Sequence, residues 1–291
     1  MKAKSLNIPA LNISGKLDSS TVAVYQAILH VTQQLDVPFL IVGASARDLV
    51  LHYGHNADIA RATRDIDFAI EVANWDAFQQ VKAVLIARGF KESDQQHRVT
   101  SPQGIPLDIV PFGPLEDATG KIEWPPGQEW EMLVQGFQEA LDNAEAVIIQ
   151  DKPLIEVPVA TPAGMALLKL IAWQDREVEK RGKDAADFLY LCESYEKIPA
   201  VSDGLYKNES LMESYEWDLT LAAASQLGQD ARAIAKALTA STISTLLNNK
   251  HETLAIGVFI SEMAAPNVGR AEELLEAFTK GFNELHWRNS E

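Results

Sequence analysis

The stretch RATRDIDFAIEV, Arg61 to Val72, places two aspartates on one side of a segment that otherwise has the composition of a buried β-strand. Side chains along a strand alternate between its two faces, so Asp65 and Asp67 point the same way. About 4 Å apart, at an effective dielectric near 20, two carboxylates repel each other by roughly 4 kcal/mol. The pair therefore predicts a divalent cation between the aspartates, or a solvated strand end with Arg61 and Arg64 as partners.

A second motif precedes this strand. In FLIVGASARDL, residues 39–49, a buried strand ends at Gly43, and the small residues Ala44 and Ser45 open a helix. The backbone N–H groups at such a helix start bind anions, including the phosphates of a nucleotide. Taken alone, the same residues are also typical of a strand-to-helix turn that binds no anion.

A third carboxylate follows in PLDIVPFG, residues 106–113, where Asp108 lies between apolar residues of another expected strand. We expect this strand beside the one that carries Asp65 and Asp67. Three carboxylates beside an anion-binding turn are the arrangement of a two-metal phosphoryl-transfer site.

Composition limits what such a site acts on. The chain has 291 residues and a net charge of −16, so its overall field repels phosphates and excludes general attraction to nucleic acid or anionic membranes. Any polyanion must be bound by a local basic patch or through a metal. No apolar run reaches the length of a membrane span and the start lacks a signal peptide, which predicts a cytoplasmic protein. The single cysteine, Cys192, excludes a structural zinc site.

The order of the predicted elements indicates an α+β fold. Up to residue 159, apolar strand segments alternate with amphipathic helices, including a hairpin at 90–100 and a strand pair at 146–159. From residue 161 onward the strand signals give way to amphipathic helices. We therefore predict an α/β domain over residues 1–160, followed by a helical bundle over residues 161–291.

These motifs resemble the nucleotidyltransferase superfamily of the DNA polymerase β type. Together with LLKLIAWQDREVEKRGKDAADFLYL, residues 167–191, they look like the AbiEii/AbiGii-type nucleotidyltransferases, toxins of type IV toxin–antitoxin and abortive-infection systems. The chain departs from the family pattern at Ala44, where the family has a second glycine, and in a longer spacer at His55 to Ala60. Both departures leave the choice of nucleotide open.

The resemblance implies a polymerase-β-like fold and transfer of a nucleoside monophosphate from an NTP to an acceptor hydroxyl. It implies that the acceptor is RNA, with tRNA 3′ ends as the favoured acceptor, and that an antitoxin is a partner of the protein. Carried over by motif, the metal ligands for Mg²⁺ or Mn²⁺ are Asp65, Asp67 and Asp108. The catalytic residues are the same three acids with Lys169 and Asp184, and the nucleotide-binding residues are Gly43, Ala44, Ser45, Arg64 and Lys169.

Helical spacing adds an expectation for the fourth motif. Steps of four, three and four place Lys169, Trp173, Arg176 and Lys180 on one helix face, either toward phosphates or toward solvent. Asp184 positions Lys169, acts as a base, or stabilises the dipole of its own helix. The predicted RNA-binding patch consists of Lys169, Arg176, Lys180, Arg181 and Lys183.

Two other functions remain open at this stage. The same chemistry could serve a small cationic acceptor such as an aminoglycoside, or a protein hydroxyl, and an acidic cleft would suit the aminoglycoside. A nucleotide-binding module without catalysis would need no Asp108. Trp124, with Pro125 and Pro126, either shapes a lid or anchors a loop in the core.

Overall fold

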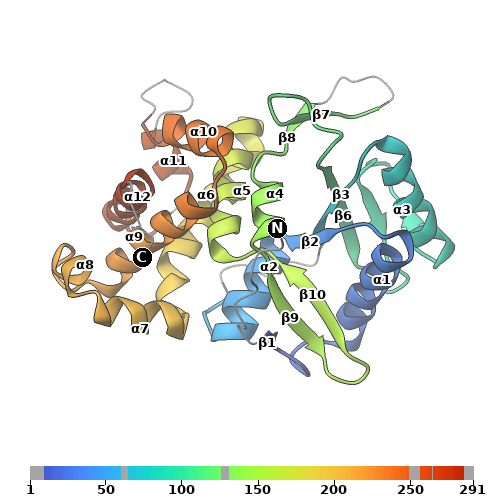
Figure 1. Ribbon diagram of the computed structural model, residues 1–291, viewed down its shortest axis with the longest axis horizontal. Coiled ribbons are helices and arrows are strands. Elements are labelled where there is room, and N and C mark those ends of the chain that lie inside the picture. Colours follow the sequence, from blue (N-terminus) through green and yellow to red (C-terminus); the bar gives the residue numbers. More distant parts are fainter. Residues whose placement is uncertain (1–9, 60–64, 126–130, 249–255, 264, 285–291) are drawn as a thin grey trace, which may run out of the picture.

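The structure is a computed structural model that describes residues 10–59, 65–125, 131–248, 256–263 and 265–284. A mixed sheet with flanking helices forms the first part, and helices form the described part beyond it (Figure 1). The predicted α+β class is therefore confirmed. No helix in the described ranges has the length and apolar character needed to span a bilayer.

Eight strands make up the main sheet, in the order β1-β9-β10-β2-β3-β6-β5-β4. Their bounds are β1 Leu11–Asn12, β2 Phe39–Val42, β3 Ile66–Glu71, β4 Lys91–Glu92, β5 Arg98–Thr100, β6 Pro106–Phe112, β9 Glu145–Gln150 and β10 Ile155–Val159. A separate pair contains β7 Lys121–Glu123 and β8 Glu131–Leu133. Strand β3 lies between β2, which runs antiparallel to it, and β6, which runs parallel. The expected neighbourhood of the two acidic strands is thus confirmed.

The helices of the first part connect these strands. They are α1 Ser19–Leu35, α2 Gly43–Arg47, the π-helical segment η1 Asp48–Gly54, α3 Trp75–Ala87 and α4 Phe137–Asp142. Helix α1 begins where the carboxylate of Asp18 accepts hydrogen bonds from the N–H groups of Ser20 and Thr21. It ends at Asp36 in the left-handed conformation. The turn from β2 into α2 and η1 matches the strand-to-helix motif of the sequence.

The rest of the described chain is helical. Its elements are α5 Pro162–Asp175, α6 Val178–Ser194, the short 3₁₀ helix η2 Tyr195–Lys197, α7 Pro199–Lys207, α8 Glu209–Glu213, α9 Leu219–Ile234, α10 Ala237–Leu247, α11 Ile256–Glu262 and α12 Val268–Asn283. Helices α9 and α12 pack closely, since a Cβ at Gly228 would lie 2.8 Å from the backbone nitrogen of Phe282. Glycine therefore sets how near these helices approach.

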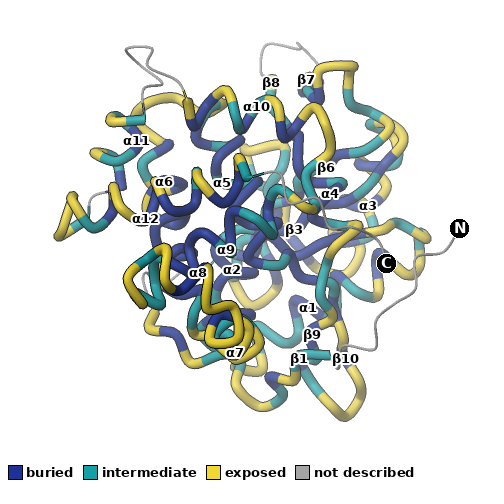
Figure 2. The backbone as a smooth tube through the Cα atoms, turned by 60° about the vertical axis from the view of Figure 1, so that its left-hand side comes forward, coloured by how far each residue is buried: buried dark blue, intermediate teal, exposed yellow. Residues whose placement is uncertain are grey.

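One hydrophobic core joins the sheet to the helices. Buried residues run from β2, β3 and β6 into α5, α6 and α9 (Figure 2). The side chain of Trp173 is fully buried against Phe259 of α11. Trp124 is also buried and packs against Trp75 and Phe78, so it anchors a loop in the core. Of the two readings of Trp124, the buried anchor is the one observed, while Pro126 lies outside the described residues. The division into domains at residue 160 stays a prediction.

Candidate active site

Strands β3 and β6 bring two of the predicted acids together. Asp67 and Asp108 are paired residues of these parallel neighbours, so their carboxylates lie side by side on one face of the sheet. Asp65 directly precedes β3, and its side chain is 42% exposed, against 14% for Asp108. The strand that carries Asp67, with Asp65 directly before it, thus lies beside the strand that carries Asp108.

The turn at Gly43 lies directly beside Asp67. Gly43 has φ +67°, a left-handed conformation, and a Cβ there would lie 2.8 Å from Cγ of Asp67 and overlap its Oδ2. Ser45 donates a hydrogen bond from Oγ to the carbonyl of Val42 at 3.0 Å and accepts one from the N–H of Asp67 at 3.4 Å. The glycine and the serine therefore fit the turn closely against the acidic strand. Ala44 lies buried between them.

The environment of Asp67 favours its protonated form. Burial, followed by the negative charge of Asp108, raises the pKa of Asp67 to about 7, although the positive charge of Lys169 acts in the opposite direction. A cation at this carboxylate would replace the proton and offset the charge of Asp108. The electrostatics thus agree with the expectation that the acids need a cation to coexist.

We expect the affinity for a divalent ion to depend on pH because of this carboxyl. Below about pH 7 the ion must displace a proton from Asp67, so the apparent affinity for Mn²⁺ should fall by roughly tenfold per pH unit and level off above it. Calorimetric titrations in two buffers of different ionisation enthalpy measure both the affinity and the proton released. An affinity that stays constant between pH 5.5 and 8 would contradict this assignment.

Arg98 is a site residue that the sequence analysis missed. In β5 it lies opposite Asp108, and its guanidinium donates from Nε to Oδ1 at 2.5 Å and from Nη2 to Oδ2 at 2.6 Å. Its Nη2 also lies 3.6 Å from Oδ2 of Asp65. The hairpin at 90–100 was predicted, but the pairing depends on the register of β5 against β6. An arginine ten residues before an aspartate gives no such signal.

The three acids form a suitable donor set for Mg²⁺, which prefers carboxylate oxygens. As the side chains lie, no three acidic, imidazole or thiol groups in the described residues converge on one point that could hold an ion. Both oxygens of Asp108 are instead turned toward Arg98. The half-buried Asp67 nevertheless fits a cation site, because its pKa is raised to about 7 and a positive charge there would offset the cost of ionisation.

Lys169 reaches the site from α5 and is held by two carboxylates of α6. Its Nζ lies 3.0 Å from Oδ1 of Asp184 and 2.7 Å from Oδ2 of Asp187, both of which are buried. Burial alone would lower the pKa of Lys169, but these two charges outweigh it, so the pKa lies above its usual value. Asp184 therefore contacts Lys169, which is the contact that a positioning role would require. Arg176 completes the group at 2.7 Å from Oδ2 of Asp184.

The same charge network extends to Arg47, in the turn between β2 and α2. Arg47 of α2, whose side chain is 2% exposed, lies 2.5 Å from Oδ1 of Asp187 and 2.8 Å from Oδ1 of Asp48. Its guanidinium also lies over the ring of Tyr190, 5.2 Å from the centroid. A chain of alternating charges thus links the strand-to-helix turn to α5 and α6. Neither Arg47 nor Asp187 was assigned a role from the sequence.

The predicted helix face around Lys169 does not exist as one surface. Helix α5 ends at Asp175 and Arg176 has an extended conformation, so Lys180 belongs to the next helix. Trp173 faces the core, where its Nε1 donates to Oε2 of Glu262 at 2.6 Å. The expectation of one continuous face was wrong because the chain breaks and turns after Asp175.

The predicted RNA-binding patch is likewise altered by pairing. Arg181 is 4% exposed, lies 2.8 Å from Oε1 of Glu262 and packs on Trp173. Lys169 and Arg176 bind Asp184, and the exposed Lys180 lies 2.7 Å from Glu177. Arg181 therefore belongs to the core and must be removed from the patch. Arg64, a predicted nucleotide-binding residue, lies outside the described residues.

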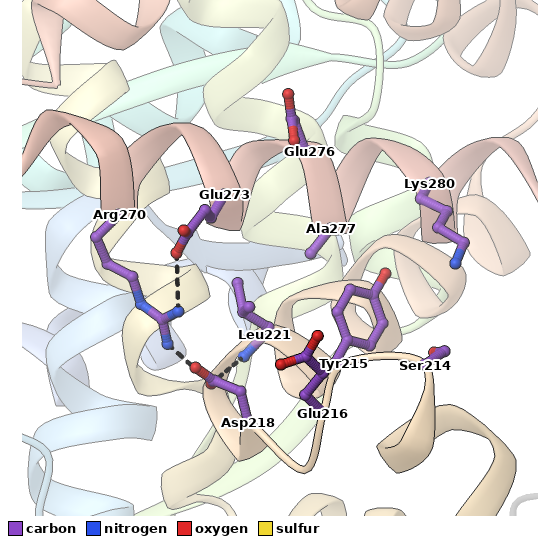
Figure 3. Close-up of a pocket in the computed structure, with 10 residues that line it drawn as sticks. All are labelled: Ser214, Tyr215, Glu216, Asp218, Leu221, Arg270, Glu273, Glu276, Ala277 and Lys280. Atoms are coloured by element: carbon purple, nitrogen blue, oxygen red, sulfur yellow. Dashed lines mark hydrogen bonds and ion pairs between the residues drawn. The ribbon is translucent and has the colours of Figure 1, made fainter.

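A cavity of about 610 Å³ lies elsewhere, among the helical elements. Figure 3 shows Arg270 between Asp218 and Glu273, at 2.8 and 3.1 Å, which joins α12 to the start of α9. None of its ten lining residues is a predicted site residue. The acidic face of β3 and β6 therefore remains the candidate active site.

The network around Lys169 makes a stability prediction. We expect Lys169→Met to lower the free energy of unfolding by about 3 kcal/mol, because it leaves the buried Asp184 and Asp187 with less compensation. Lys180→Met, at an exposed pair with Glu177, should change it by less than about 0.5 kcal/mol. Urea unfolding followed by fluorescence provides both values. Equal effects of the two substitutions would show that Lys169 is not held as described.

A comparison with family models identifies the family of the chain. A family model described as nucleotidyl transferase AbiEii toxin, type IV TA system, matches residues 27–255. No curated protein matches the chain.

Solved structures give more distant likenesses. The antibiotic-resistance factor ANT(2″)-Ia in solution is 15% identical with a TM-score of 0.39, over 69% of this chain and 98% of that one. A crystal structure of ANT(2″)-Ia with adenylyl-2″-tobramycin is 16% identical with a TM-score of 0.38, over 72% and 99% of the two chains. The Thermotoga maritima CCA-adding enzyme complexed with tRNA is 11% identical with a TM-score of 0.26, over 93% and 80%.

Proposed function

Because the chain belongs to the AbiEii family of nucleotidyltransferase toxins, we propose that it transfers a nucleoside monophosphate from an NTP to an RNA hydroxyl, with tRNA 3′ ends as the acceptor. Nucleotidyltransferase activity follows from membership of the family, whereas RNA as the acceptor is what we propose. The observation that supports it most is the pairing of Asp67 with Asp108 beside the Gly43 turn. That pairing places acidic oxygens next to backbone suited to a phosphate.

The acids have distinct roles in this proposal. Asp65, Asp67 and Asp108 hold Mg²⁺ or Mn²⁺, which when bound supplies positive charge to the phosphate oxygens. Asp108 also accepts the proton of the attacking hydroxyl, for which it must first release Arg98. The release of pyrophosphate completes the transfer.

The nucleotide is bound from two sides. Gly43, Ala44 and Ser45 present the turn on which the triphosphate lies, and Arg64 belongs to the same proposed set. Lys169 faces it from α5, and its charge already acts on Asp67. Asp184 positions Lys169 through the contact at 3.0 Å. These assignments unite residues from the sheet and from the helices in one site.

The acceptor must approach a protein of net charge −16. RNA would bind through few phosphate contacts, so binding should be weak and fall steeply with salt. The pairing of Lys169, Arg176 and Arg181 with carboxylates favours a second candidate, a cationic small molecule of the aminoglycoside kind. A cognate antitoxin and a cytoplasmic site of action accompany the RNA proposal, since the family description is of a toxin–antitoxin system.

The acceptor is tested by labelling. The purified protein, with Mg²⁺ and each α-labelled NTP in turn, should label total cellular RNA mainly in the tRNA size range, and Asp65→Ala should abolish the label. Parallel reactions contain an aminoglycoside panel and a whole-cell protein extract. Label on a drug or a protein, with none on RNA, would refute the RNA acceptor. NTP binding with no labelled product would favour a binding module.

A further inference from the structure

Arg98 occupies the position between two proposed metal ligands. Its guanidinium donates two hydrogen bonds to Asp108, at 2.5 and 2.6 Å, and its Nη2 lies 3.6 Å from Oδ2 of Asp65. A guanidinium that binds a carboxylate with two parallel hydrogen bonds is a strong and geometrically specific partner. While this contact persists, both carboxylate oxygens of Asp108 accept hydrogen bonds from Arg98 and are not available to a metal ion.

Arg98 lies near the edge of the sheet, where its side chain is accessible to solvent. It comes from β5, a strand of three residues with only β4 between it and the edge of the sheet. Its side chain is 30% exposed, whereas that of Asp108 is 14% exposed. The buried arginines of this chain differ, since Arg47 and Arg181 are nearly inaccessible. A change of rotamer at Arg98 would carry its charge toward solvent without unpacking the core.

We propose that Arg98 is a displaceable cation that substitutes for the metal, holding Asp108 away from it until a metal–nucleotide complex arrives. This inference rests on the proposed function. Once Asp65 and Asp108 hold a divalent ion, the guanidinium of Arg98 would leave Asp108 and bind phosphate oxygens of the nucleotide. Arg98 thus acts as a positioning residue for Asp108 before binding and as a phosphate partner afterwards.

The contact between Arg98 and Asp108 should weaken binding of the metal ion when no nucleotide is present. A ligand whose binding-competent state is only partly populated binds more weakly by that fraction. If Asp108 is released from Arg98 about a tenth of the time, the bare ion binds about tenfold more weakly than it would to an open site. Nucleotide relieves this penalty because it offers the arginine a new partner. The metal and the NTP should therefore bind with positive cooperativity that depends on Arg98.

The experiment measures Mn²⁺ binding by electron paramagnetic resonance at pH 8, with and without a non-hydrolysable NTP. We expect Arg98→Gln to bind Mn²⁺ about tenfold more tightly than the wild type without nucleotide, and to lose most of the cooperativity. Arg88→Gln, at an exposed arginine that contacts Gln34, is the matched control for loss of one positive charge and should change the affinity by less than twofold. Arg98→Lys, which keeps the charge without the paired hydrogen bonds, should lie between the wild type and Arg98→Gln.

An unchanged or weaker Mn²⁺ affinity in Arg98→Gln would overturn the inference, because Arg98 would then only orient Asp108 for the ion. Equal gains in Arg98→Gln and Arg88→Gln would overturn it as well, since net charge alone would explain them. If the expected gains appear but RNA stays unlabelled, the inference is supported and the proposed acceptor fails. If neither protein binds Mn²⁺, both the inference and the metal site fail.

Discussion

Asp67→Asn is expected to slow nucleotidyl transfer by on the order of a thousandfold while leaving the unliganded protein at least as stable. The catalytic loss arises because an amide oxygen without charge replaces the central carboxylate of the proposed metal site. About 4 kcal/mol of lost transition-state stabilisation corresponds to that factor. Transfer is measured with α-labelled NTP, and metal synergy as the rise in melting temperature with Mg²⁺ and NTP together.

The stability part of this prediction follows from the pKa of Asp67. In the unfolded chain this carboxyl loses its proton near pH 4, whereas in the folded protein it keeps the proton up to about pH 7. Between these values the folded state binds more protons, so the contribution of Asp67 to stability declines as the pH rises. Asp67→Asn removes that decline and should be no less stable at pH 8.

Glu71→Gln on the same strand is the control, because it removes a charge at the far end of β3. It should leave transfer and metal synergy close to those of the wild type. If Asp67→Asn unfolds the protein, the aspartate is a structural residue and the metal assignment is wrong.

Gly43→Ala is expected to reduce NTP binding and transfer by at least a hundredfold and to destabilise the fold by about 2 kcal/mol. An alanine at this position must keep the left-handed backbone conformation, which costs roughly 1–2 kcal/mol. Its methyl group would also overlap the carboxylate of Asp67. Either the turn moves or Asp67 turns away from Asp108. Nucleotide binding by calorimetry and thermal unfolding separate these effects.

A matched control isolates the contact from the strain. Gly15 also has a left-handed backbone, with φ +80°, but a Cβ there would meet nothing within 4 Å. Gly15→Ala should therefore cost similar stability and leave NTP binding unchanged. Equal binding by the Gly43→Ala and wild-type proteins would show that the turn does not hold the triphosphate.

Local patterns predicted where the acidic residues lie in the fold. The alternation of a strand puts Asp65 and Asp67 on one side, and the apolar residues around Asp108 identify a strand that the structure places beside β3. Gly43 was identifiable because the turn from β2 into α2 is a short-range event. Each of these inferences needs only neighbours in sequence or a resemblance in short motifs.

Long-range pairing accounts for what was missed or mistaken. Arg47 meets Asp187, 140 residues later, and Arg181 meets Glu262, 81 residues later. No spacing rule reports such partners, so Arg181 was read as a surface residue of an RNA-binding patch. Arg98 escaped notice because its role depends on how β5 aligns with β6. The composition of a segment does not specify that register.

We expect the contact between Arg47 and Asp187 to couple the unfolding of the sheet to that of the helices. Arg47 keeps Asp48 and Asp187 keeps Lys169 within its own part of the chain, but each of these buried ions loses one partner when the two parts separate. Heating should therefore give a single calorimetric transition, with equal van 't Hoff and measured enthalpies. A fragment limited to residues 1–160 should expose its core to hydrophobic dyes. Amide hydrogen exchange in β2 and α6 should report one shared opening event.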